Sequence, residues 1–268
     1  RSQAPILHHS MPRSISMAST GVLAVDEAIK ELYKTGYMHN HMRMYVAAIC
    51  TNMAFAHWKI PARWMYYHLL DADWASNALS WQWVAGSNAN KKYVANQENI
   101  NKYWKSIQKD TFLDVSYSAF ENWEVPPELM LLDDTPLKCE LPEKSALHLD
   151  YGEKVLIYNF YNLDPNWHED ENANRILLLE PSFFERYPVS SKTIEFMLDL
   201  SSNIKEVQVF VGEFDELEIE GLEVIFKEHP TNLHYRGQQE ERDWMFSVKG
   251  YFPSFFSFWK KCKKELTW

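Results

Sequence analysis

The sequence predicts a helical N-terminal region followed, after a linker, by a small α/β domain. Apolar residues recur at helical spacing through residues 25–104, whereas short apolar runs bounded by turns lie within residues 155–226. Between these regions the periodicity fades, and prolines are spaced among acidic and polar residues. We therefore divide the 268-residue chain into a helical domain at residues 1–110, a Pro-rich acidic linker at 111–150 and an α/β domain at 151–268.

The net charge of -10 is unevenly distributed. Residues 1–110 contain 12 Lys and Arg against 7 Asp and Glu, while residues 111–268 contain 15 against 30. The two parts thus carry charges of +5 and -15. A mildly basic helical part is compatible with a polyanionic partner, whereas the acidic part is not expected to contact nucleic acid broadly.

The cysteines indicate a reducing compartment. Cys50, Cys139 and Cys262 are scattered and odd in number, and they lack the spacing of a disulfide framework or a structural zinc site. The longest apolar runs, such as residues 176–179, are far shorter than the roughly 20 residues of a membrane span. We expect a soluble, cytoplasmic protein with no membrane segment and no metal.

The helical region begins with two predicted helices. Apolar residues at helical spacing predict a helix over Val25 to Lys34, which Thr35-Gly36 would end. A longer helix rich in Ala and Met is predicted from His39 to His57, and we expect it to be largely buried.

Three further helices follow. Pro61 suits a first helical turn, so a helix is predicted over Ala62 to Leu70, with Trp64, Met65 and Leu69 facing inward. Asp71 and Asp73 precede a helix over Trp74 to Trp83, where a carboxylate can cap free amides. The last predicted helix of the region runs from Asn96 to Trp104.

Two polar helix faces stand out in this region. Asn40, Arg43 and Met44 lie three and four residues apart on one helix, and Asn77 and Trp81 lie four apart on another. Side chains with this spacing share a helix face. Two such faces could close on one ligand.

Several short motifs, in order, resemble the flavin-binding helical domain of the photolyase and cryptochrome family. The resemblance covers roughly residues 18–105. It implies FAD as cofactor, and Asn40 favours the cyclobutane-dimer branch, including DASH-like members, over enzymes that carry a histidine there. The motifs are Thr20-Gly21-Val22-Leu23-Ala24-Val25-Asp26, Thr35-Gly36-Tyr37-Met38-His39-Asn40, Leu70-Asp71-Ala72-Asp73, Ser76-Asn77 and Trp81-Gln82-Trp83.

The resemblance implies a set of flavin-contacting residues. Asp71 and Asp73 look like the family's acidic pair facing the flavin, and Asn77 looks like the side chain beside the reactive nitrogen N5. Asn40 and Arg43 look like the facing helix, with Arg43 paired to Asp71. The alternative for either aspartate is a helix N-cap alone.

The same resemblance implies residues for electron transfer and for DNA. Trp81 and Trp58 match the first two members of the tryptophan chain that passes an electron to photoexcited flavin. Packing in the core is the alternative for buried tryptophans, and we favour electron transfer because both positions agree with the family. Met44 and Trp83 match positions lining the cavity for an extruded pyrimidine dimer. His41 stands where a phosphate-contacting arginine is frequent.

The triplet His39-Asn40-His41 spells a nuclease motif but does not predict a metal site. It opens an apolar helix, which is expected to place the two histidines on different faces. Glycine-rich phosphate-binding motifs are also absent from the sequence.

The expected function is FAD-dependent, blue-light-driven electron transfer that repairs cyclobutane pyrimidine dimers in UV-damaged DNA, a lyase activity of a longer parent protein. The chain starts at Arg1, and residues 1–19 look like a loop within a longer chain, so we interpret the domain as N-terminally truncated with only the later half of the flavin pocket. The alternatives are a cryptochrome-like light sensor, a non-repairing FAD-binding protein, or a scaffold without flavin.

The α/β domain is predicted from four buried strands, and its role is not evident from the sequence. A helix between the second and third strands indicates a strand-helix-strand unit with a right-handed crossover. The strands are expected at residues 155–160, 175–179, 207–211 and 223–226, and the helix at 190–200.

The C-terminal tail is aromatic from Gly250 to Trp259 and then basic through Lys264. A helix that packs its aromatic rings inward explains this pattern. The alternative, a surface that stacks single-stranded bases, requires those rings to be exposed.

Overall fold

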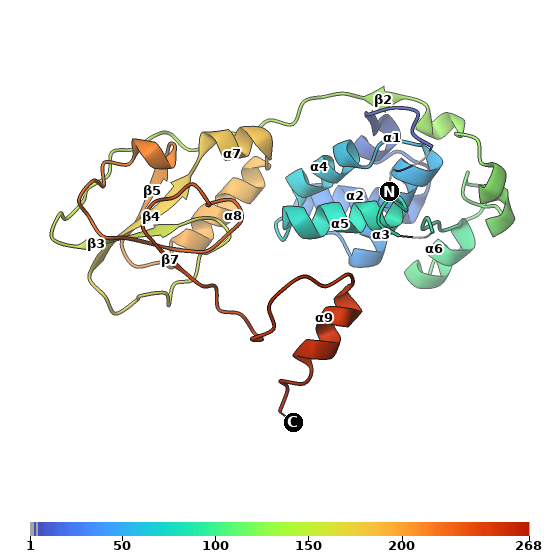
Figure 1. Ribbon diagram of the computed structural model, residues 1–268. Helices are drawn as coiled ribbons and strands as arrows, with labels where there is room; N and C mark the ends of the chain where they lie inside the picture. The colour runs from blue at the N-terminus through green and yellow to red at the C-terminus, as the bar shows by residue number, and fades with distance from the viewer. Residues whose placement is uncertain (1–2, 4, 90, 268) are drawn as a thin grey trace. The chain divides into compact units, whose positions relative to one another are not determined.

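The protein, seen here as a computed structural model, forms two units (Figure 1). The structure describes residues 3, 5–89 and 91–267. The helical unit comprises Arg1–Pro142 together with Pro181–Asp199, and the sheet unit comprises Glu143–Glu180 together with Leu200–Trp268. Among the described residues, no helix has both the length and the apolar content required to cross a membrane.

The helical unit is built from short helices joined by tight turns. A small antiparallel pair of strands, β1 and β2, lies at its edge. Its elements are β1 (Met11–Pro12), α1 (Arg13–Ser16), α2 (Leu23–Thr35), α3 (Asn40–Ala48), a π-helical turn (Ile49–Met53), α4 (Lys59–His68), α5 (Trp74–Val84), α6 (Gln97–Trp104), 3₁₀ turns at Tyr117–Asn122 and Pro127–Leu129, β2 (Leu132–Asp133), α7 (Pro181–Arg186) and α8 (Ser191–Ser201).

The predicted stop after α2 is confirmed. Gly36 caps the helix with φ 74°, in the left-handed region that favours glycine. A Cβ atom at this position would lie 2.4 Å from Cγ of Leu70. Glycine is therefore required here both for its backbone conformation and for the close approach of the α4–α5 turn.

The helix predicted from His39 to His57 is shorter than expected. His39 is its N-cap, and α3 gives way at Ile49 to the π-helical turn, in which Ala54 donates to the Ile49 carbonyl at 2.9 Å. The Thr51 hydroxyl donates to the Ala47 carbonyl at 2.7 Å and competes with regular helix bonding. Phe55, at φ 55°, then ends the turn.

The helices predicted at residues 62–70 and 74–83 are present as α4 and α5, but α4 begins earlier, at Lys59, and ends at His68, so that Leu69 is its C-cap. Trp64, Met65 and Leu69 are buried. The carboxylate of Asp73 caps α5 by accepting a hydrogen bond from the Ser76 amide at 2.7 Å. Asn96 caps α6 in the same way, through the Asn99 amide.

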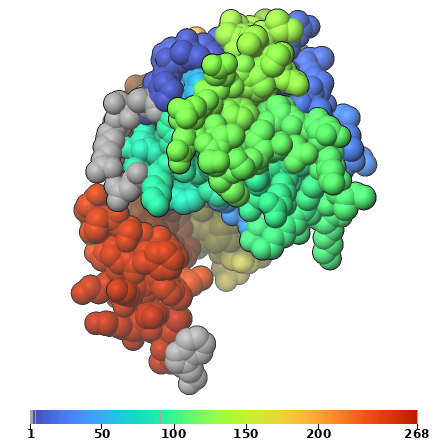
Figure 2. All heavy atoms as spheres, turned by 90° about the vertical axis from the view of Figure 1, so that its right-hand side faces the viewer, coloured from blue at the N-terminus to red at the C-terminus, as the bar shows by residue number. Residues whose placement is uncertain are grey.

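The chain that follows α6 packs against the helical core. Leu113 and Leu129 are buried in the same hydrophobic cluster as α1 to α5. Trp123 packs against that cluster and donates its indole N–H to the Met53 carbonyl at 3.0 Å. In Figure 2 this segment (green) lies over the earlier helices of its unit. The first part of the predicted linker therefore contributes to the core.

The sheet unit contains a five-stranded parallel sheet in the order β5-β4-β3-β6-β7. The four predicted strands are confirmed, and the helix predicted at residues 190–200 is present as α8, most of which belongs to the helical unit and not to the sheet unit. The edge strand β7 was not predicted, because its three polar residues show no apolar alternation. The strands are β3 (Lys154–Tyr158), β4 (Ala173–Leu179), β5 (Val207–Val211), β6 (Val224–Lys227) and β7 (Gln238–Glu240).

One face of this sheet forms a hydrophobic core. Alternate residues of the strands, such as Ile157, Ile176 and Phe226, meet side chains from the 3₁₀ turn Phe214–Glu216 and the loop after it. Ile157 lies in register with both Ile176 and Phe226. The alternation of buried residues follows the pleat of the strands.

The C-terminal tail forms α9 (Phe255–Cys262), which begins with a capping box between Ser254 and Ser257. The prediction that its aromatic residues all pack inward is wrong. Tyr251, Phe255 and Phe256 are 91%, 65% and 73% exposed. A helix of eight residues has too little surface to bury all the rings that this stretch carries.

Candidate functional site

The start of α3 and the turn between α4 and α5 are held together by an arginine. The Nη2 atom of Arg43 donates to both carboxylate oxygens of Asp71 at 3.0 Å, so the predicted ion pair is confirmed. Its Nε atom donates to the Met38 carbonyl at 2.7 Å. The Leu70 amide, which donates to the Gly36 carbonyl at 2.9 Å, adds a second link between the two turns.

The polar residues around this pair are open on one side. Asn40 is exposed on the first turn of α3, and the side chains of Asp71 and Arg43 are 57% and 23% exposed. Asp73 is exposed, although one of its oxygens caps α5. The N-cap role of Asp73 is therefore established by the geometry, and Asp71 instead acts as the partner of Arg43.

Asn77 lies on α5 where that helix packs against α4. It is half-buried, and its Nδ2 atom donates to the Ala62 carbonyl at 2.8 Å. Because this bond fixes which end of the amide is the donor, the second N–H and the Oδ1 atom are left to serve a ligand. A neutral group with one donor and one acceptor can bond to a ring nitrogen in either protonation state.

The two predicted electron-transfer tryptophans differ in environment. Trp81 is fully buried at 1% exposure, whereas Trp58 is half-buried and packs against the edge of the core. Among the ring pairs formed by the described residues, none joins Trp58 to Trp81. Their role in electron transfer stays a prediction.

The predicted DNA-contacting residues lie on α3 and α5. Met44 is half-buried against the core, and Trp83 is 46% exposed with its ring 5.8 Å from that of Tyr93. His41 is exposed and stacks on Tyr103, with 5.2 Å between ring centroids.

The expectation that His39 and His41 lie on different faces is wrong. Their rings stack at 5.4 Å with only 9° between their planes. The helical spacing rule does not apply because His39 is the N-cap, outside the helix. Within the described residues, no group of three or more His, Cys, Asp or Glu side chains is arranged to hold a metal ion.

The structure adds aromatic residues that were not predicted for the site. Tyr103 and Trp104, in the last turn of α6, extend the His39 and His41 stack. Tyr37 lies 5.8 Å from the Arg43 guanidinium. Adjacent aromatic residues at positions 103 and 104 could have signalled this surface, since neighbouring positions on one short helix cannot both face its core.

A cavity of about 790 Å³ in the helical unit lies against Tyr33, Trp64 and His68. The Trp64 indole donates to the Tyr33 hydroxyl at 3.2 Å, and that hydroxyl donates to the Ser16 carbonyl at 2.6 Å. Burial raises the pKa of Tyr33 to about 12 and lowers the pKa of His68 to about 4. The three rings are therefore neutral near pH 7, and none belongs to the predicted flavin residues.

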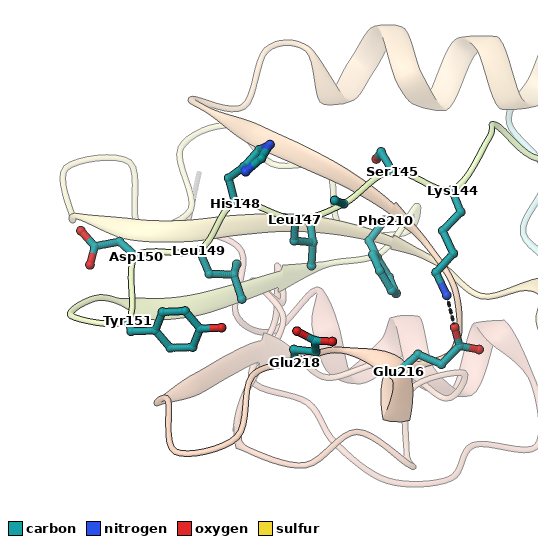
Figure 3. Close-up of a pocket in the computed structure, with 11 residues that line it drawn as sticks. Lys144, Ser145, Leu147, His148, Leu149, Asp150, Tyr151, Phe210, Glu216 and Glu218 are labelled. Carbon is teal, nitrogen blue, oxygen red and sulfur yellow. Dashed lines mark hydrogen bonds and ion pairs between the residues drawn. The ribbon is translucent and has the colours of Figure 1, made fainter.

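A second cavity, of about 960 Å³, lies in the sheet unit (Figure 3). Leu147, Leu149 and Phe210 point into it, and Lys144 reaches across its rim to pair with Glu216. Its lining has no residue that the sequence predicted for the site. Its one described lysine is neutralised by that ion pair.

Comparison with known proteins identifies the region that holds the predicted site. Residues 12–117 match the family described as FAD binding domain of DNA photolyase. The deoxyribodipyrimidine photo-lyase of Agrobacterium fabrum is 44% identical over 70 residues, which are 26% of this chain and 15% of that protein. The photo-lyase of Streptomyces griseus is 43% identical over 68 residues, 25% of this chain and 15% of that protein.

Cryptochrome-2 of Arabidopsis thaliana is similar over the same length. It is 37% identical over 68 residues, 25% of this chain and 11% of that protein. This chain therefore spans a small part of the relatives it matches. Residues 12–117 form an FAD-binding domain of the photolyase and cryptochrome family, and FAD is the cofactor of this domain.

The residues present fit such a cofactor. Every predicted flavin-contacting side chain lies within the matched residues. The open side of the Arg43–Asp71 pair and the spare amide groups of Asn77 can bond to the edge of a flavin ring.

Proposed function

We propose that the helical unit provides flavin-contacting residues of the FAD pocket of a light-driven photolyase that repairs cyclobutane pyrimidine dimers in DNA. The Arg43–Asp71 pair carries this proposal. It joins two helix-entry turns within the matched domain and leaves polar atoms of both side chains partly exposed. Half-buried Asn77, on the helix that follows Asp71, also keeps unused amide groups.

In this proposal Asn40, Arg43, Asp71, Asp73 and Asn77 hold the isoalloxazine end of FAD. The bound cofactor supplies the absorption of blue light and the transferable electron. The Arg43 guanidinium donates strong hydrogen bonds, and the Asp71 carboxylate balances its positive charge. The pair therefore orients a ring without adding net charge to the site. Asn77 offers one donor and one acceptor from a position fixed by the Ala62 carbonyl.

The proposed DNA contacts lie on the same unit. Met44 and Trp83 offer an apolar wall and a partly exposed aromatic face to an extruded dimer. His41 stands in a surface stack with Tyr103, over which Lys102 lies at 5.7 Å. The charge of +5 on residues 1–110 supports a polyanionic partner.

Trp81 and Trp58 are the proposed route for photoreduction of the bound cofactor. Indole oxidises readily, and Trp81 is shielded from water by its burial at 1% exposure. The three free cysteines support our placement of the protein in the cytoplasm.

A cryptochrome-like light sensor, or another non-repairing FAD-binding protein, is the second candidate. The similarity to Cryptochrome-2 favours it, because the same flavin-contacting residues serve sensing and repair. The acidic C-terminal part, with 15 basic against 30 acidic residues after position 110, would then provide the signalling surface.

The test measures flavin content and photoreduction. Purified protein should show the blue-region absorbance of oxidised flavin, and illumination with a reductant should bleach it. Asn77→Ala should destabilise the reduced flavin and leave folding intact, whereas Asn88→Ala, whose side chain also donates to a backbone carbonyl, should change nothing. Unaltered photoreduction in Asn77→Ala would contradict the role of Asn77, and absent flavin absorbance would favour the scaffold.

Repair separates the two candidates. Reduced protein is illuminated with an oligonucleotide that carries a cyclobutane dimer, and intact bases are measured. Restored bases establish the photolyase. A protein that photoreduces its flavin but leaves the dimer unchanged is the sensor.

A further inference from the structure

The last described residues, 246–267, form a segment that differs from the rest of its unit, and we refer to it as the C-terminal arm. The arm contains five lysines and one glutamate, whereas the remainder of residues 111–268 contains 10 basic and 29 acidic residues. Four of the lysines lie within positions 260–264. In Figure 1 an extended stretch leads from β7 to the arm, which ends in α9.

The arm closes on itself. Within it, Phe258 contacts Phe252 at 5.4 Å, and Trp259 contacts Phe246 at 6.0 Å. The Glu265 carboxylate accepts hydrogen bonds from the amide and the hydroxyl of Ser247, at 2.8 and 2.6 Å. These contacts tie the two ends of the arm together and leave its inner rings half-buried.

Three rings stay largely exposed, although Phe255 stacks on Trp259 with 6.3 Å between ring centroids. Tyr251, Phe255 and Phe256 are among the most exposed large side chains of the described residues. On α9, Phe256 and Lys260 lie four residues apart and therefore share a helix face. Figure 2 shows the side chains of the arm (red) at the surface. Exposed rings beside a dense group of lysines indicate a binding surface.

We propose that the C-terminal arm binds single-stranded DNA. The lysines neutralise backbone phosphates, and the exposed rings stack on unpaired bases, whose π-faces are accessible only when the strand is not in a duplex. This inference rests on the proposed function in one respect, the choice of DNA as the partner. The binding surface itself is inferred from the exposed rings and the lysines. It adds a DNA contact outside the helical unit, next to an otherwise acidic domain that repels the strand.

The geometry favours a strand over a membrane surface. An interfacial helix needs a continuous apolar face, but Phe246 and Phe252 already occupy part of that face on α9. The remaining rings can each stack on a separate base. The helix also has only eight residues, which is short for stable burial in a lipid interface.

The test is fluorescence anisotropy with the complete 268-residue chain, in the dark, and a labelled, undamaged single strand of about 16 nucleotides. The triple variant Tyr251→Ala, Phe255→Ala, Phe256→Ala should bind roughly ten-fold or more weakly. Replacing Lys260, Lys261, Lys263 and Lys264 by Gln should reduce the slope of log K against log salt by about 2 to 3.

Matched controls replace exposed side chains elsewhere in the sheet unit. Leu233→Ala and Lys205→Gln should bind like the parent chain. Circular dichroism of each variant confirms that it is folded, which is expected because every changed side chain is exposed.

Three results would overturn the proposal: unchanged affinity in the aromatic variant, duplex bound at least as tightly as the single strand, or binding to anionic vesicles of phosphatidylserine without binding to the strand. The measurement requires neither FAD nor light nor a lesion. A chain that binds no flavin can therefore still support the arm's role, and loss of arm binding leaves the flavin proposal untouched.

Discussion

Two arginines, Arg43 in the helical unit and Arg175 in the sheet unit, show how the units use the same side chain differently. Arg175 is 2% exposed, and its guanidinium donates to the carbonyls of His168, Glu169 and Glu171 at 2.6, 3.3 and 2.9 Å. It closes the long connection between β3 and β4. Arg43 is 23% exposed and pairs with a carboxylate at a joint between helices.

The difference separates architecture from a binding site. A buried guanidinium whose partners are backbone carbonyls has its donors used by the fold, so it can do little else. A half-open guanidinium whose partner is an exposed carboxylate leaves polar atoms of both groups beside solvent. Only the second arrangement can contact a ligand without first breaking the fold.

Arg175→Met should have the largest effect. The variant removes a 2%-exposed guanidinium and leaves three part-buried carbonyls without their donor, and we expect a loss of about 3 kcal/mol in the free energy of unfolding. Hydrogen exchange read by mass spectrometry should show the loss in the strands β3 and β4. Arg236→Met, which removes an exposed pair with Asp215, should cost under about 0.5 kcal/mol. Equal effects of the two changes would contradict the comparison.

Acid should destabilise the two units in different pH ranges. Burial in the helical unit lowers the pKa of His68 to about 4. Below about pH 6.5 the unfolded chain therefore binds more protons at His68 than the folded protein does. Stability should be full above that pH and fall by about 3 kcal/mol as the pH drops to 4. His68→Phe should remove this decline, and His148→Gln, at an exposed position, should not.

The sheet unit should respond at lower pH. Hydrogen bonds from Lys154 and His168 lower the pKa of Glu171 to about 2. Because this folded value lies below the ordinary one, the contribution of Glu171 is present above about pH 4.5 and is lost as the pH falls through 2. Hydrogen exchange in β3 should therefore stay protected at pH values where the helices around His68 have begun to open. Simultaneous opening of both units would argue against separate responses.

Arg43→Ala should have a smaller effect on folding and a larger one on the cofactor. The pair is partly exposed, so we expect a loss of about 1.5 kcal/mol, measured by urea denaturation. The variant should also retain less flavin on gel filtration. Arg43→Lys restores the charge but not the two bonds to Asp71, and it should rescue stability better than flavin retention. Full flavin retention in Arg43→Ala would exclude the proposed site.

Asp73→Ala should have the smallest effect, about 1 kcal/mol, since it removes the N-cap of α5. Asp73→Asn keeps an acceptor for the Ser76 amide and should restore most of the stability. Thermal denaturation monitored by circular dichroism provides the measurement. If Asp73→Ala and Asp73→Asn lower flavin retention equally, compared with the unmutated protein, the negative charge of Asp73 serves the cofactor as well as the helix.

Local features with a local cause were predicted correctly. The end of α2 follows from Gly36, the cap of α5 from Asp73, and four strands from short apolar runs. The Arg43–Asp71 pair was predicted from the family resemblance, which specifies a contact between residues far apart in the sequence.

Features that depend on hydrogen bonds competing for one carbonyl, on pairing with a distant strand, or on how many rings a short helix can cover were not predicted. The end of α3 depends on the Thr51 hydroxyl competing for the Ala47 carbonyl, and β7 exists because β6 offers it a free edge. The exposure of Phe255 and Phe256 depends on which rings the arm closes around. The spacing of apolar residues along the sequence reveals none of these causes.

The sequence alone determined the helical and α/β regions, the helix caps and the resemblance to a flavin-binding domain, because these depend on spacing, turn residues and short motifs. Only the tertiary structure decided which polar groups remain open: Arg175 is sealed by carbonyls, Arg43 is half-open, and Asn77 is oriented by Ala62. The physical reason is that a side chain's remaining donors and acceptors depend on partners brought from elsewhere in the chain.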